Sequence, residues 1–155
     1  MRNGYGVMSW PDGTVFEGQW LNDERHQGKQ TMTDHNIYEG GFLNDKFHGI
    51  GKIIFTREHM TFEGLFKDGK QSNVGRLINQ KSGETYIGEV VDNVVRHGVG
   101  IHISKDRKYE GEFRDDEPVG LGRITFENGD VFYGETQRMM RVGPGRMEYN
   151  QSDHS

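Results

Sequence analysis

The sequence contains no cysteine among its 155 residues, which excludes disulfide bonds, thiolate zinc sites and cysteine nucleophiles. It has only three prolines, so it resembles neither collagen nor a flexible linker. No apolar run approaches the roughly 20 residues that a membrane-spanning helix needs, and the N-terminus lacks a signal-peptide pattern. We therefore expect a soluble, cytoplasmic protein.

The chain is also poor in apolar residues and lacks a large basic block. Hydrophobic residues make up 32% of it, which is little material for a thick globular core. The formal net charge is −5. Because phosphate binding needs clustered lysine and arginine, this balance disfavours nucleic acid as the main partner.

Glycine and aromatic residues are what the sequence has instead. Glycine accounts for 23 of the 155 residues, about twice its usual share of ~7%. Aromatic residues reach 11%, which argues against disorder. Much glycine together with many rings and few aliphatic residues indicates thin, repeated β structure.

Residues 109–132 show the basic unit most clearly. Side chains of a strand alternate between its two faces, so Tyr109, Gly111 and Phe113 share a face while the residues between them are charged. A second alternating run follows at 122–126. The stretch is therefore predicted to be a hairpin with one aromatic face and one charged face, which needs similar neighbours to be stable.

The same pattern recurs along the chain at intervals of 22 to 24 residues. Its first marker, aromatic-x-Gly, begins at Phe16, Tyr38, Phe62, Tyr86, Tyr109 and Phe132. Its second marker, Gly-x-Gly, occurs at Gly4-Tyr5-Gly6, Gly49-Ile50-Gly51, Gly98-Val99-Gly100, Gly120-Leu121-Gly122 and Gly143-Pro144-Gly145. The chain begins at the second strand of a repeat, which leaves open that it is part of a longer protein.

This pattern, YxGxF followed by a turn and HGxGxxxFxxGxx, resembles the MORN repeat (membrane occupation and recognition nexus) from Gly4 to about Tyr149. The resemblance implies an all-β fold, an elongated single-layer antiparallel sheet of consecutive hairpins with about 13 strands. We expect one domain at 1–149 and a polar tail at 150–155. The domain comprises a partial repeat at 4–15 and repeats that start at 16, 38, 62, 86, 109 and 132.

Four repeats depart from the pattern. The first keeps one glycine of the pair at Gly28, and in the third Asn73 replaces the first glycine. In the fourth, Val90 and Val91 stand where a large aromatic residue is expected, and Val94 lengthens the turn. An inserted residue moves the side chains that follow it to the opposite face of the sheet unless a bulge absorbs it. We therefore predict a bulge at 94–97. In the sixth, Thr136 replaces an aromatic residue.

The polar residues that could support chemistry have simpler explanations. Three histidines occupy one position before the glycine pairs, which favours a structural role in a turn: His26, His48 and His97. The acidic run 115–117 lies in a predicted turn at 114–121 and is interpreted as solvated. We predict no catalytic residue, metal site or cofactor.

The aromatic face is the predicted binding surface. We expect that a one-layer sheet cannot hide all of its rings. An exposed ring leaves about 100 Å² of apolar surface, which is worth about 2.5 kcal/mol. A row of exposed rings marks an interaction site. The predicted protein-binding residues are Trp20, Phe42, Phe66, Phe113, Tyr38, Tyr86 and Tyr109. A possible contact with acidic lipid or an acidic partner is assigned to Arg138, Arg141 and Arg146.

We therefore expect a non-enzymatic scaffold that receives a helix or an extended segment of another protein in an aromatic groove. Edge-to-edge sheet pairing or a homodimer would also use such a ribbon. The resemblance implies a ciliary complex, such as the radial spoke, or another cytoskeletal complex. The alternatives are a peripheral membrane adaptor that binds acidic phospholipid and a regulatory module of a larger enzyme.

Overall fold

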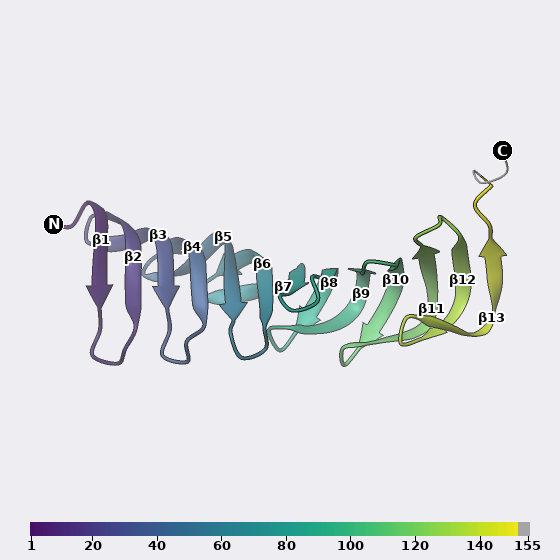
Figure 1. The fold of residues 1–155 in the computed structure, drawn as a ribbon. Coiled ribbons are helices and arrows are strands. Elements are labelled where there is room, and N and C mark those ends of the chain that lie inside the picture. The colour runs from purple at the N-terminus through teal and green to yellow at the C-terminus, as the bar shows by residue number, and fades with distance from the viewer. Residues whose placement is uncertain (152–155) are drawn as a thin grey trace. The chain divides into compact units, whose positions relative to one another are not determined.

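The computed structural model describes residues 1–151, which contain strands and turns and no helix (Figure 1). By their contacts the residues form two units, unit 1 at 1–81 and unit 2 from Ser82 onward. The strands of unit 1 are β1 Gly4–Ser9, β2 Val15–Leu21, β3 Glu24–Thr31, β4 Ile37–Leu43, β5 Lys46–Phe55, β6 Met60–Lys67 and β7 Lys70–Asn79. Those of unit 2 are β8 Thr85–Val91, β9 Val95–Ile103, β10 Arg107–Arg114, β11 Glu117–Phe126, β12 Val131–Gln137 and β13 Met140–Glu148.

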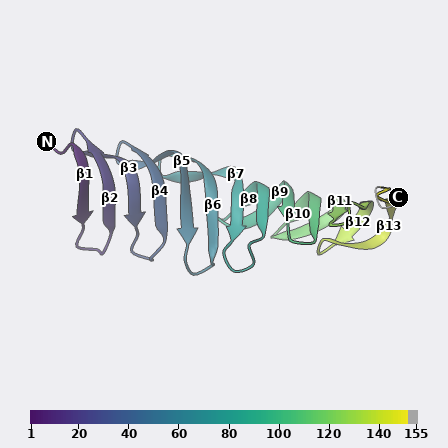
Figure 2. The ribbon, with the colours of Figure 1, turned by 45° about the horizontal axis from the view of Figure 1, so that its top comes forward.

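Within each unit every strand pairs antiparallel with the next one in the sequence. Figures 1 and 2 show β1 to β6 side by side in this order. The predicted fold class, consecutive hairpins with 13 strands and one open layer in each unit, is confirmed. In the described residues no helix is long and apolar enough to span a membrane.

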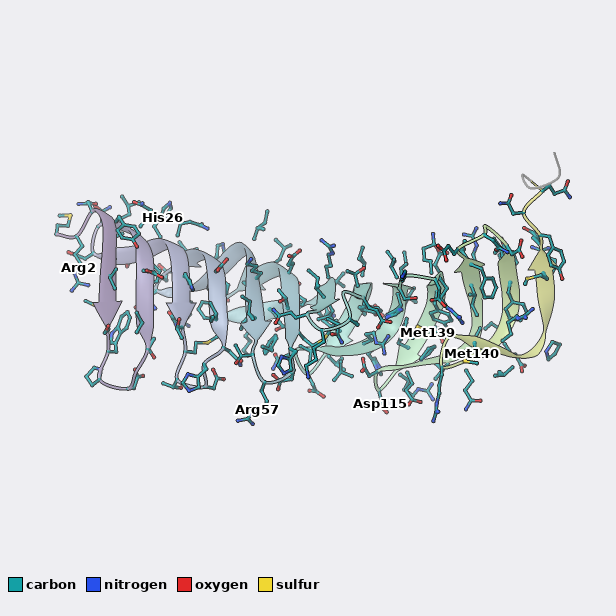
Figure 3. The ribbon with its side chains drawn as sticks, viewed as in Figure 1. Arg2, His26, Arg57, Asp115, Met139 and Met140 are labelled. Carbon is teal, nitrogen blue, oxygen red and sulfur yellow. The ribbon has the colours of Figure 1, made fainter. Side chains whose placement is uncertain are left out.

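The turns inside the repeats are short because their residues accept a left-handed backbone. Asn22 and Asp23 have φ of 52° and 67°, and Asp115 and Asp116 have φ of 48° and 71°. Positive φ at both central residues suits the right-handed twist of a hairpin and favours asparagine, aspartate and glycine. The predicted turn at 114–121 is therefore too long, because β11 already begins at Glu117. Asp115 and Met139 mark two of these turns in Figure 3.

A bulge occurs in every repeat and not only in the fourth. There the register shifts between Gly88 and Val90, opposite residues 97–99, so the bulge overlaps the predicted 94–97 only at His97. The same shift follows Gly40, Gly64, Gly111 and Gly134 and lies between Gln19 and Trp20. The extra residue of the fourth repeat is instead absorbed by its turn, where the Val94 amide donates to the Asp92 carbonyl at 2.9 Å.

The face that carries the first aromatic residue of each repeat is called the inner face, and the opposite one the outer face. On the inner face each of these rings lies flat over glycines of its hairpin. A Cβ atom at Gly51 would stand 2.8 Å from the Tyr38 hydroxyl, and one at Gly122 would stand 2.5 Å from Cε2 of Tyr109. The glycine pairs are therefore needed for close approach of a ring to the strands.

Candidate interaction surface

The predicted aromatic residues meet on the inner face as two ladders of rings. In unit 1 the ring of Phe16 contacts that of Phe42 in the next repeat at 5.2 Å, edge to face. Tyr38 contacts Phe66 of the following repeat in the same way at 4.9 Å. Edge-to-face pairs add about 0.5–1.5 kcal/mol each beyond their buried area. The ladder therefore ties each repeat to its neighbour.

Unit 2 repeats this arrangement with fewer rings. The ring of Tyr86 lies 5.0 Å from that of Phe113, and Tyr109 lies 5.3 Å from Phe113, both edge to face. Phe113 thus joins two repeats in unit 2, as Phe42 and Phe66 do in unit 1.

A residue early in the second strand of a repeat covers these rings. Phe47 stacks on Tyr38 with ring centroids 3.8 Å apart. Arg25 places its guanidinium 4.9 Å from the centre of Phe42, and Arg96 lies 5.0 Å from that of Phe113. A cation over an aromatic face is attracted by the ring quadrupole. These three side chains close the inner face over the ladders.

The prediction that the inner face exposes a row of rings is wrong. The seven predicted binding residues are 0% to 7% exposed: Tyr38, Tyr109, Tyr86, Phe113, Phe66, Phe42 and Trp20. The reason is geometric, because rings that lie over glycine and under a covering side chain leave no free surface. These rings form the core of each unit, and their role in binding a partner stays a prediction.

Tyrosine hydroxyls satisfy the backbone at the bulges. The Tyr38 hydroxyl donates to the Gly41 carbonyl at 2.8 Å, and the Tyr86 hydroxyl donates to that of Glu89 at 2.7 Å. Burial raises the pKa of both tyrosines to about 12. Both therefore remain protonated hydrogen-bond donors at neutral pH.

Two departures of unit 2 from the repeat pattern are accommodated in the core. Val90 and Thr136 are buried at the position of the missing rings. The Thr136 hydroxyl lies within hydrogen-bond distance of the Gly120 carbonyl at 3.2 Å and the Tyr109 hydroxyl at 3.4 Å. A hydroxyl contact thereby replaces a ring contact between the fifth and sixth repeats.

Sequence reasoning missed the most unusual core residue, His102. It is paired with Tyr86 on one side and Tyr109 on the other, where Ile124 stands in the next repeat. Its Nδ1 atom is buried without a hydrogen-bond partner, and its Nε2 atom lies 3.6 Å from a carboxylate oxygen of Glu84. Burial lowers the pKa of His102, with Arg96 as a further cause. The imidazole is therefore neutral at pH 7.

The acidic run at 115–117 is not simply solvated, because Asp116 binds the neighbouring repeat. Arg96 donates from Nε to the Asp116 carboxylate at 2.8 Å and from Nη2 to the Asp116 carbonyl at 2.6 Å. In unit 1 Arg25 makes the same two contacts with Asp45, at 2.7 and 2.9 Å. Each arginine therefore joins two successive turns and covers a ring. This double role was not visible from the sequence.

The three C-terminal arginines do not form one patch. Arg138 lies in a turn with φ of 52°. Arg141 lies on the inner face, with its guanidinium 5.8 Å from the ring of Phe132. Arg146 is paired with Tyr133 on the outer face, where it lies 4.7 Å from that ring. Their predicted contact with an acidic surface stays a prediction, but no single flat surface can engage all three at once.

The structure indicates no metal site among the described residues at the three turn histidines His26, His48 and His97. In the part of the chain that the structure describes, no three histidine, aspartate or glutamate residues are grouped to hold a metal ion. His26 is exposed, near the top of unit 1 in Figure 3.

The exposed apolar residues lie on the outer face. The middle residues of the Gly-x-Gly triplets point there, and Ile50, Leu121 and Val99 are 82%, 72% and 64% exposed. In unit 1 Ile50 pairs directly with Leu65, and Val74 stands beside them on β7, next to the paired Gly64 and Gly75. Ile50, Leu65 and Val74 are here called the apolar cluster. For Ile50 the sequence signal was its position between two glycines, Gly49 and Gly51.

A row of alternating charge runs across the outer face of unit 1. Its members are successive cross-strand partners: Glu17, Lys29, Glu39, Lys52, Glu63 and Arg76. Lys52 lies 3.3 Å from Glu39, and Arg76 lies 3.5 Å from Glu63. Opposite charges that face each other across strands stabilise the pairing modestly. This charge row therefore supports the observed register of the strands at a small energetic gain.

A furrow of about 600 Å³ lies along the charge row. The side chains that line it project from the outer face of β2 to β6. The charged residues line one side, and Gln27 and Ile50 line the other. The residues that line it are Glu17, Gln27, Gly28, Lys29, Glu39, Gly40, Ile50, Gly51, Lys52, Glu63 and Gly64.

Comparison with known proteins agrees with this architecture. A search of the curated proteins finds no significant match. The family model of the MORN repeat matches residues 1–15, 16–26, 38–57 and 109–131, and therefore both units. MORN repeats are in general non-catalytic modules for interaction with proteins or membranes. The four matches, and hairpins that recur in the same register between them, show that the chain belongs to the MORN-repeat proteins.

Proposed function

We propose that this protein is a non-enzymatic scaffold whose outer face binds an extended segment of another protein. One observation carries the proposal: the inner rings are buried by the chain itself, whereas apolar side chains at repeat spacing are exposed on the outer face. Exposed apolar residues that form a contiguous patch mark interaction sites more often than scattered ones do.

The apolar cluster is large enough to contribute to binding. Each of Ile50, Leu65 and Val74 exposes more than half of its surface. Burying one such side chain fully is worth about 1.5–3 kcal/mol. Because association and ordering consume part of this gain, three residues together support a micromolar contact at best unless the charge row also takes part.

The proposed setting is cytoplasmic, within a cytoskeletal or ciliary complex such as the radial spoke. This part of the proposal rests on analogy with other MORN-repeat proteins alone. A protein partner is favoured over a membrane because the arginines that could contact acidic lipid lie on different faces of unit 2.

The proposal is tested by charge substitutions on the outer face. A variant with Ile50→Lys, Leu65→Lys and Val74→Lys is expected to remain folded, because the three side chains are exposed, and to lose its partner in quantitative co-purification. The control carries Leu21→Lys and Leu43→Lys, which are exposed to a similar degree at the ends of β2 and β4. Retention of the partner by the first variant, with circular dichroism unchanged, contradicts the proposal.

A further inference from the structure

We propose that a cleft on the outer face of unit 2 binds a lysine or arginine side chain of a partner protein, with the aliphatic stem on an apolar wall and the cationic head at two glutamates. The site goes beyond the proposed function, because it uses neither the apolar cluster nor the furrow of unit 1. Its evidence is the opening between two strands, the side chains that line this opening and the charges around it.

The cleft lies where β11 and β12 stop pairing. Their register ends at Leu121 and Glu135, whereas the register of β9 with β10 continues one pair further, to Gly98 and Phe113. In the sixth repeat the smaller Thr136 stands at the position that Phe113 fills in the fifth, and it lines the cleft. A cleft of about 410 Å³ is left among β11, β12 and β13, which are labelled in Figure 1. Ligand pockets usually measure about 300–1,000 Å³.

The lining of the cleft combines apolar and acidic side chains. Glu117, Val119 and Leu121 alternate along β11 on the outer face, and Glu135 and Gln137 do so along β12. All five line the cleft, and Val142 of β13 completes its apolar part. The cleft therefore offers an apolar wall beside carboxylate groups, which suits a ligand that is itself part apolar and part charged.

The sign of the ligand follows from the carboxylates. Glu117 and Glu135 line the cleft, and no lysine, arginine or histidine does. In residues 1–151 neither glutamate forms an ion pair, because the paired cations of unit 2 are engaged elsewhere: Arg96 with Asp116, Arg107 with Asp106, Lys108 and Arg123 with Glu110, and Arg146 with Glu148. The cleft therefore favours a cation.

The surrounding charge has the same sign. Residues 82–151 include 13 acidic and nine basic residues, a net charge of −4, whereas residues 1–81 include ten of each. In the described residues no three histidine, aspartate or glutamate side chains are grouped to hold a metal ion. An organic cation therefore fits this cleft better than an inorganic one.

The apolar wall selects a cation on an aliphatic stem. Leu121 and Val142 are 72% and 57% exposed, so a stem that covers them removes apolar surface from water. Lysine and arginine lay their methylene stems along apolar surface and keep the charged head at polar groups. Their heads carry only hydrogen-bond donors, whereas carboxylates carry only acceptors. Such charge-assisted hydrogen bonds are stronger than neutral ones.

Arg114 is a cation that can compete with the ligand. It is the cross-strand partner of Glu117, but it is exposed and does not line the cleft. An exposed pair contributes little, and the ligand gains the burial of its stem in addition. We therefore expect Arg114→Gln to strengthen binding.

The test follows the amide resonances of the isotope-labelled full chain by NMR. The probe is N-acetyl-lysine amide. N-acetyl-norleucine amide has the same four-carbon stem without the charge, and methylammonium has the charge without the stem. We expect the probe to shift resonances at 117–121, 135–137 and 142 and to bind at least fivefold tighter than either control. The dissociation constant should be millimolar, because a single side chain makes few contacts.

Protein variants locate the site and test its charge. The double substitution Glu117→Gln and Glu135→Gln is expected to weaken the probe at least fivefold and to leave norleucine binding within twofold. Glu127→Gln, an exposed glutamate of unit 2 outside the cleft, should leave both within twofold. Arg114→Gln should tighten the probe about twofold. The NMR spectra themselves verify that each variant is folded.

Four results would overturn the proposal. They are equal affinity for the lysine and norleucine probes, shifts only at residues outside the cleft, equal effects of Glu127→Gln and the double substitution, and weaker binding by Arg114→Gln.

Failure of this site is distinguishable from failure of the proposed function. If the lysine probe does not bind but the variant at Ile50, Leu65 and Val74 still loses its partner, only the cleft of unit 2 is wrongly assigned. If that variant keeps its partner while the probe binds as expected, the cleft stands and the apolar cluster is not the docking surface.

Discussion

The cores of the two units fill equivalent positions of the inner face with different residues. In unit 1 the inner face is filled by rings, and Tyr38 alone contacts the rings of Phe42, Phe47 and Phe66. In unit 2 Val90 and Thr136 stand at ring positions. Unit 2 nevertheless keeps the same strand register and the same bulges.

The difference shows which features of the repeat are required. The glycine pair and the left-handed turn fix the backbone, and both persist where the rings do not. The buried positions require adequate volume and satisfied polar groups, which valine and a hydrogen-bonded threonine can provide. We therefore expect unit 1 to depend more on single rings than unit 2 does.

Removing a ring should have the largest effect on stability, and the size of the effect should differ between the two units. Tyr38→Ala is expected to cost about 3–5 kcal/mol of stability, because it opens a cavity at the centre of three ring contacts. Tyr109→Ala should cost less, since among the rings of residues 1–151 Tyr109 contacts Phe113 alone. Urea unfolding followed by circular dichroism measures both, with the exposed Tyr5→Ala as control. An equal or larger cost for Tyr109→Ala contradicts the comparison.

The arginine contacts should instead be equivalent in the two units. Arg25→Ala and Arg96→Ala each remove hydrogen bonds to a turn and a cation over a ring, and each should cost about 1–3 kcal/mol. The exposed Arg114→Ala should change stability by less than about 0.5 kcal/mol. Thermal unfolding of the three variants tests this equivalence. A loss of stability in only one of the two variants, Arg25→Ala or Arg96→Ala, would show that the repeats use this arginine differently.

His102 should make unit 2 sensitive to acid. Because its pKa is lowered in the folded chain, the unfolded chain binds more protons below pH 6.5, and stability falls as the pH decreases through 6.5 toward the folded value. His102→Leu should remove this part of the pH dependence and raise stability at pH 7 by about 1 kcal/mol, since it removes a buried unpaired nitrogen. Unfolding of both proteins between pH 7.5 and 5 gives the difference, and parallel curves argue against it.

The smallest expected effect is a gain at the last turn. Arg138 and Met139 have φ of 52° and 61°, which neither side chain favours, whereas unit 1 uses Asn44 and Asp45 in the same turn. Replacing the pair by asparagine and glycine should stabilise the protein by about 0.5–1 kcal/mol. The same exchange at Asn44 and Asp45 should instead lower stability, because it removes the Asp45 carboxylate that accepts a hydrogen bond from Arg25. Differential scanning calorimetry resolves the two, and a loss of stability at 138–139 contradicts the turn assignment.

The sequence predicted the strands well because alternation and glycine spacing are local properties. The Tyr109 hairpin and the positions of the repeats follow directly from the period of two and from the aromatic-x-Gly marker. The bulge predicted at 94–97 overlaps the observed one at 97–99 only at His97, because every repeat has this bulge and the turn absorbs the extra residue.

The burial of the rings could not be predicted in the same way. Alternation assigns a ring to a face but does not show that Tyr38 lies flat over Gly51 or that Phe47 stacks on it. Coverage by Arg25 depends on contacts between neighbouring repeats. The exposed residues of the outer face were visible as the middle residues of Gly-x-Gly, but their meaning depends on knowing that the inner face is closed.

Hydroxyl-radical footprinting with mass spectrometry tests the central claim most directly, because it compares side chains of one type on opposite faces of the folded chain. Tyr5 is 67% exposed, whereas Tyr38, Tyr86 and Tyr109 are at most 2% exposed. We expect rapid modification of Tyr5, Ile50 and Leu121 and strong protection of the three inner tyrosines. Modification of the inner tyrosines at the rate of Tyr5 would contradict a closed inner face and an accessible outer one.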